Sequence, residues 1–148
     1  WRIDSGVEAN MRYTAPKNIA LFSEMNVFTE DECRARQTAV LEHYTGQVEI
    51  EVLTMIDMLN QHVIPSAKKS QMGDLAALQA GVKTLQASVS AIHAADTIEE
   101  KAQLARVLRL ETMIDVRQVC DAAEAVIPAS EWTLATYHDL LFLDQTTE

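Results

Sequence analysis

The chain has 148 residues, enough for one domain with a buried core, and 48% of them are hydrophobic although only 5% are aromatic. Twelve basic against 22 acidic side chains give a formal net charge of −10, which argues against nucleic acid and anionic membrane surfaces as partners. No apolar run reaches the roughly 20 residues that span a bilayer, so direct membrane insertion is not expected. Few glycines and prolines, without regularly spaced turn signals, predict an all-α fold. We expect a soluble protein. Its compartment is unknown, and a location inside an organelle, reached after removal of a targeting segment, is one alternative.

The chain opens with an arm, a short helix and a well-defined helix start. Residues 1–15 show no sustained apolar period and predict an irregular N-terminal arm. Pro16 fits the first turn of a helix, and Asn26 is expected to end the short helix that begins there. Thr29 starts the next helix, because its hydroxyl can accept from the third helical amide while Glu32 reaches back to the cap.

A long helix is predicted from Thr29 to Ile64. Its apolar residues recur at steps of three and four and therefore share one face: Val40, Leu41, Tyr44, Val48, Val52, Met55, Ile56, Leu59 and Val63. Such a helix would be roughly 54 Å long, so a joint is expected, and Gly46 is its predicted place. Pro65 is expected to end the helix, because its ring collides with the carbonyl four residues earlier, although a few helical residues can follow it.

A heptad pattern lies between residues 75 and 92. Asp74 can cap the start of this helix, and its seam alternates steps of three and four through Leu75, Leu78, Val82, Leu85, Val89 and Ile92. About two and a half heptads favour packing inside an antiparallel bundle over an extended coiled coil. A seam that faces a partner is the alternative.

The last long helix is predicted to begin at Asp96 or Thr97 and to end at Pro128. Its apolar stripe drifts after Leu108 and resumes at Met113. This shift indicates different neighbours for the two halves of the helix.

The predicted architecture is an antiparallel helical bundle of about four main helices over residues 16–128. An irregular N-terminal arm, 1–15, precedes the bundle, and a short C-terminal docking segment, 129–148, follows it. That tail is too apolar to be left in water, so we expect it to pack on the bundle or on a partner. The candidate interaction residues are Trp1, Trp132, Tyr137, Leu140, Leu141 and Phe142.

No catalytic residue, cofactor site or metal site is predicted. A di-iron bundle needs Glu-x-x-His pairs, but the residues three before the four histidines are Val40, Leu59, Ser90 and Ala135. Motifs for covalent haem, for a phosphate-binding loop and for zinc are also missing from the sequence. Glu111 and Asp115 are interpreted as a charged outer face, and His138 with Asp139 as a helix-capping pair.

Five short stretches occur in a distinctive order, at residues 17–22, 27–29, 50–58, 64–67 and 136–142. In sequence and spacing they resemble the C-terminal region of type III glutamine synthetases, over residues 16–142, with 71–124 similar mainly in helical character. The resemblance implies a helical domain that follows the catalytic domain. It also implies that the residues that bind ATP, glutamate and metal belong to that catalytic domain and are absent here. The family's tail tends to read Trp-Pro-x-Pro-Thr-Tyr-Gly-Asp, whereas residues 132–139 contain no proline or glycine.

Three functions follow as hypotheses. The leading one is a non-catalytic, stand-alone domain that acts as a structural or linker subunit among other protein subunits of a larger assembly. The alternative is a fragment of a full-length type III synthetase, in which the domain would support oligomeric contacts. The third is a small-molecule or pigment binder, motivated by Met55, Met58 and Met113, which are more simply interpreted as core filler.

Overall fold

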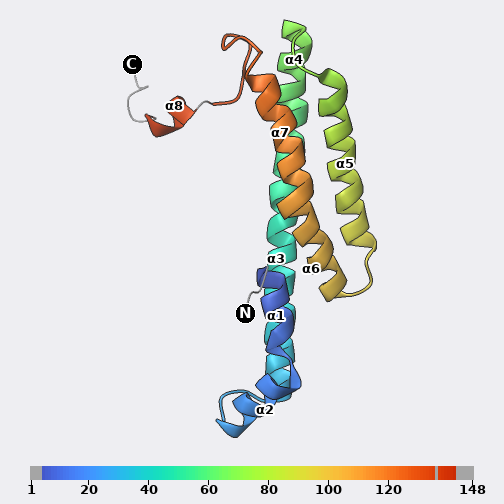
Figure 1. Ribbon diagram of the computed structural model, residues 1–148, viewed down its shortest axis with the longest axis vertical. Coiled ribbons are helices and arrows are strands. Elements are labelled where there is room, and N and C mark those ends of the chain that lie inside the picture. Colours follow the sequence, from blue (N-terminus) through green and yellow to red (C-terminus); the bar gives the residue numbers. More distant parts are fainter. Residues whose placement is uncertain (1–4, 136, 143–148) are drawn as a thin grey trace.

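The computed structural model describes residues 5–135 and 137–142, and all regular structure in these two ranges is helical (Figure 1). The helices are α1 (Gly6–Tyr13), α2 (Pro16–Glu24), α3 (Glu30–Met58), α4 (Ile64–Ser70), α5 (Leu75–Ala94), α6 (Ile98–Val107), α7 (Met113–Glu124) and α8 (Tyr137–Leu141). Two π-helical turns, η1 (Leu59–Val63) and η2 (Leu108–Thr112), join α3 to α4 and α6 to α7. The prediction of an all-α fold is confirmed.

Three long rods make up most of the molecule (Figure 1). The first rod is α3 with η1 and α4, the second is α5, and the third is α6 with η2 and α7. The second rod, α5, runs antiparallel to the other two, as expected for an antiparallel bundle (Figure 1). The N-terminal half of α3 extends beyond the other rods, where α1 lies along it and α2 packs at its end. The result is an elongated molecule.

The main core fills the space between the three rods. Its fully buried members are Val48, Val52, Leu59, Leu78, Leu85, Ala105 and Leu108. The predicted heptad seam lies in this core, so the seam packs inside the bundle. Gly81 allows α5 to approach α7 closely, because a Cβ there would lie 3.0 Å from Cγ1 of Val116.

Short polar caps define the starts of the rods. Thr29 and Glu32 form the predicted capping box, with the Thr29 hydroxyl accepting from the Glu32 amide at 3.3 Å. Asp74 accepts from the amide of Ala77, and Thr97 caps α6. These starts were predictable, because each depends on residues within one helical turn.

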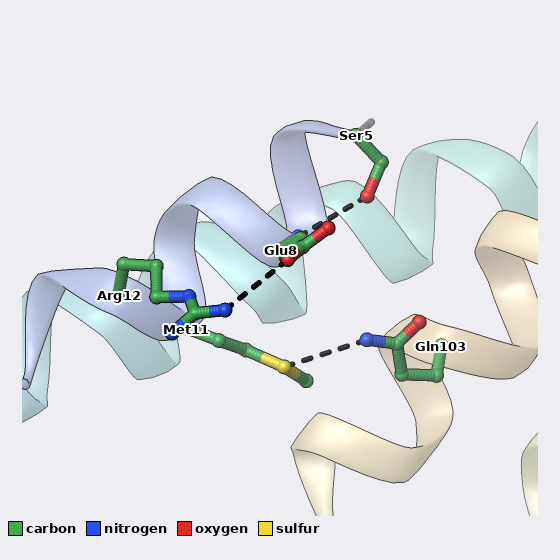
Figure 2. A network of polar contacts seen from close by, with 5 residues as sticks. All are labelled: Ser5, Glu8, Met11, Arg12 and Gln103. Carbon is green, nitrogen blue, oxygen red and sulfur yellow. Dashed lines mark hydrogen bonds and ion pairs between the residues drawn. The ribbon is translucent and has the colours of Figure 1, made fainter. Parts of the chain in front are cut away.

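The prediction of an irregular N-terminal arm is wrong from Gly6 to Tyr13, where the chain forms α1. Ser5 caps this helix by accepting from the amide of Glu8 at 3.2 Å. One turn later, Arg12 pairs with the Glu8 carboxylate at 3.4 Å (Figure 2). A helix of eight residues is marginal by itself in water, so these local contacts alone do not explain it.

Packing against α3 and α6 stabilises α1. Val7 is buried in a small second core with Leu41 and Ala102. Figure 2 shows the adjacent polar contact, in which Nε2 of Gln103 on α6 donates to Sδ of Met11 at 3.4 Å. The local signals, the Ser5-x-x-Glu8 cap spacing and the Glu8–Arg12 pair, are too weak to predict a stable helix without these partners from distant parts of the chain.

The first rod does not break where the sequence predicted. α3 runs through Gly46 without a joint, and the rod continues past Pro65 to the end of α4 at Ser70. The π turn η1 explains this continuity, because the Ile64 amide donates to the Leu59 carbonyl, five residues back. The wider turn relieves the collision between the proline ring and the carbonyl four residues earlier.

The second π turn explains the drift of the apolar stripe in the third rod. At η2 the Met113 amide donates to the Leu108 carbonyl, so one five-residue step replaces a step of four. The two halves also have different neighbours, as the sequence indicated. α6 packs on α1, α3 and α5, whereas α7 packs mainly on α5.

Candidate interaction surfaces

A groove lies between the C-terminal part of the first rod and α7. Because α7 packs mainly on α5, it leaves space beside α3 and η1. The hollow has a volume of about 270 Å³. Its walls come from three segments: Met55, Met58, Leu59 and Val63 on α3 and η1, Arg117, Cys120, Asp121 and Glu124 on α7, and Trp132 and Leu134 after α7. We call it the α3–α7 groove.

The segment after α7 is held against the bundle and closes one side of this groove. Trp132 and Leu134 are half-buried against the main core. Two contacts with the first rod fix the segment: Nζ of Lys69 lies 2.6 Å from a carboxylate oxygen of Glu131, and Nδ1 of His62 shares a hydrogen bond of 3.0 Å with the Thr133 hydroxyl. The predicted interaction residue Trp132 thus packs on the bundle and forms a wall of the groove.

Cys120 shows how the groove changes the chemistry of a side chain. Burial in this apolar setting raises the pKa of the Cys120 thiol to about 11, and the neighbouring carboxylate of Asp121 adds to the effect. The thiol therefore stays protonated at neutral pH and acts as a small apolar part of the groove wall.

Four predicted interaction residues, Tyr137, Leu140, Leu141 and Phe142, lie on or directly after α8, which stands away from the rods (Figure 1). Leu141 is 76% exposed, and Leu140 and Phe142 are also exposed. Leu140 lines a hollow together with Trp132 and Leu134, so α8 continues the apolar surface of the groove. Trp1 lies outside the described residues, and so does the side chain of Tyr137.

A second apolar surface lies at the opposite end of the molecule, on and after α2 (Figure 1). α2 has no buried residue, and Leu21, Met25 and Val27 are all at least half exposed, Met25 reaching 64%. We call these three residues the distal patch. This patch was not predicted from the sequence, although the consecutive apolar residues 19–22 surround a helix more completely than one packed face requires.

The methionines that motivated a ligand-binding hypothesis are not brought together. Met55 and Met58 line the α3–α7 groove, whereas Met113 packs against the main core. The groove volume of about 270 Å³ lies below the ~300–1,000 Å³ typical of pockets for drug-sized molecules. The groove is better suited to a few side chains of a protein partner.

The described part of the chain contains neither a metal-binding cluster nor a membrane-spanning helix. Among those residues, no group of His, Cys, Asp and Glu side chains could hold a metal ion. No helix in the same residues is both long and apolar enough to cross a bilayer. Glu111 and Asp115 are both exposed, as expected for a charged outer face.

Comparison with known proteins gives one consistent relationship. A family model described as the glutamine synthetase C-terminal domain matches residues 2–85. A glutamine synthetase from Butyrivibrio fibrisolvens is 29% identical over 159 aligned residues, which cover 88% of this chain and 23% of that protein. A type-3 glutamine synthetase from Dictyostelium discoideum is 33% identical over 64 residues, which cover 43% of this chain and 9% of that protein. The chain thus spans less than a quarter of the length of these relatives.

Proposed function

Because this chain belongs to the glutamine synthetase C-terminal domain family, we propose that it is a non-catalytic helical linker that joins protein subunits in a larger assembly. Other protein chains are its partners in this proposal. In this proposal the domain contributes architecture and takes no part in the chemistry of the glutamine synthetase reaction.

The proposal is supported by apolar side chains that are exposed at both ends of an elongated molecule, in addition to those, such as Ile50 and Ile114, that are exposed along the rods. At one end lie the α3–α7 groove and α8, and at the other lies the distal patch on and after α2 (Figure 1). Single exposed apolar residues are common, but grouped ones mark sites of association. Two such surfaces, held apart by rods with their own core, suit a bridge between two neighbours.

The size of the native particle tests the proposal. Native material is separated by mass under non-denaturing conditions, and the chain is then detected on a denaturing gel in the second dimension. We expect the chain to run in a particle far heavier than its own 16.5 kDa and to be released as a small polypeptide by denaturation. Migration as a free monomer in the first dimension would overturn the proposal.

The second candidate function is support of the oligomer of a full-length glutamine synthetase. The observation that favours it is the alignment of 88% of this chain with a glutamine synthetase from Butyrivibrio fibrisolvens. In that case the same surfaces would contact other parts or copies of the synthetase. The denaturing dimension of the experiment distinguishes the two, because a synthetase-sized band that contains this sequence supports the second candidate alone.

A further inference from the structure

We propose that the α3–α7 groove binds a basic amphipathic helix of a partner protein. This inference rests on the proposed linker function and adds the chemistry of the partner at one end of the molecule. A helix that docks in a groove inserts apolar side chains from one face and leaves its polar face at the rim. The groove must therefore offer an apolar floor and a rim of complementary charge.

The floor of the groove is apolar and adaptable. Met55, Met58, Leu59 and Val63 come from the first rod, and Cys120 adds a protonated thiol from the third. Met58 is 42% exposed, so the floor is open to an incoming side chain. Methionine suits such a surface, because its unbranched, polarisable side chain adjusts to different partners.

The rim of the groove is acidic. Asp121 and Glu124 lie on α7, and Asp139 on α8 lines an adjoining hollow with Glu124 and Trp132. The basic group along this rim, Arg117, lies 3.6 Å from the Asp121 carboxylate and is partly neutralised by it. Among the described residues of the groove itself, the carboxylates of Asp121 and Glu124 exceed the single Arg117 cation, so lysine and arginine side chains on a partner helix would be attracted.

The same charges disfavour a second copy of this chain as the occupant. With a formal net charge of −10, two copies repel one another, and pairing the grooves would bring two acidic rims together. A basic partner removes both penalties. The exposed side chains of Leu140 and Leu141 on α8 extend the apolar contact beyond the groove itself.

The test uses the full chain and two dye-labelled synthetic helices, one built from leucine and lysine and the other from leucine and glutamate. Binding is measured by fluorescence anisotropy. We expect saturable binding of the leucine–lysine helix that weakens with added salt, and no binding of the leucine–glutamate helix. Equal binding of both helices, or no binding of the basic one, would overturn the proposal.

Matched variants locate the binding site. Glu124→Lys reverses a charge at the rim, and Glu99→Lys makes the same change at the exposed start of α6, outside the groove. Met58→Gln removes an apolar side chain from the floor of the groove. Its control, Ile50→Gln, removes an exposed apolar side chain of α3 that lies outside the groove. We expect each groove variant to bind the basic helix with an affinity lowered roughly fivefold or more, and each control variant to bind it about as tightly as wild type. Equal losses in variant and control would place binding outside the groove.

Failure of this inference is distinguishable from failure of the linker function. If the native chain runs as a free monomer, the linker function fails whatever the peptides do. If the chain resides in a large particle but Glu124→Lys and Met58→Gln enter that particle as well as wild type, the linker function stands and the assignment of the groove is wrong.

Discussion

Cys120 and Trp132 define the groove at the scale of single residues, and they differ in how far the sequence could reveal them. The sequence predicts that Trp132 is covered, because a large aromatic group in an apolar tail is costly to leave in water, and Trp132 is half-buried against the main core. The position of Trp132 could not be predicted from the sequence, since it depends on the Lys69–Glu131 and His62–Thr133 contacts between segments far apart in the chain. The environment of Cys120 likewise follows from packing around the groove.

The raised pKa of Cys120 makes stability depend on pH in the alkaline range. The folded chain holds the thiol proton more tightly than the unfolded chain, whose thiol titrates near its ordinary pKa of 9.0. The stabilising contribution is therefore complete below pH 9 and is lost as the pH rises towards about 11. We expect Cys120→Ala to lose less stability than wild type over this interval.

Urea unfolding followed by circular dichroism checks this expectation. The quantity compared is the fall of the unfolding midpoint across the alkaline interval in wild type and in Cys120→Ala. Other groups titrate in both proteins, so the variant supplies their baseline. A fall of the same size in both would show that the Cys120 thiol ionises as freely when folded as when unfolded.

At the scale of elements, the sequence predicted what is local and missed what depends on distant contacts. The caps at Thr29 and Asp74 and the heptad seam were correct, since each is encoded within a few residues. The helix α1 was missed because its core partners Leu41 and Ala102 come from α3 and α6. The π turn η2 is visible in the sequence as a five-residue step in the apolar stripe. The π turn η1 was not predicted, because Pro65 was expected to end the helix.

Two glycines in the rods have opposite roles, which gives a paired prediction. Gly46 lies within continuous α3, and a Cβ there would meet no atom within 4 Å. We expect Gly46→Ala to raise the free energy of unfolding by up to about 1 kcal/mol, the usual gain in helix propensity. At Gly81 the added Cβ meets Val116, whose branched side chain has one favoured helix rotamer and cannot easily yield. We expect Gly81→Ala to lower stability by about 1 kcal/mol.

Urea unfolding of both variants measures the two changes under the same conditions. A loss of stability in Gly46→Ala would indicate a joint at that position after all. A gain in Gly81→Ala would mean that α5 and α7 have room to separate.

At the scale of the whole molecule, the arrangement of the rods determines what is available for binding. The apolar cluster of the tail, Leu140, Leu141 and Phe142, was visible in the sequence as a candidate for contact with the bundle or a partner. The α3–α7 groove could not be predicted from the sequence, because it arises where α7 packs on α5 and not on α3. The distal patch was missed for a related reason, since only the packing of α2 shows which of its apolar residues remain exposed.

The proposed bridging role requires that both ends of this elongated molecule contact other proteins. Cross-linking of the native assembly with an amine-reactive reagent, followed by mass spectrometry, measures these contacts. Lys17 is exposed on α2 near the distal patch, and Lys68 is exposed on α4 at the end of the molecule that carries the groove. We expect each lysine to form cross-links to peptides of other polypeptides. Cross-links confined to this chain, or to partners at one end only, would contradict the bridging role.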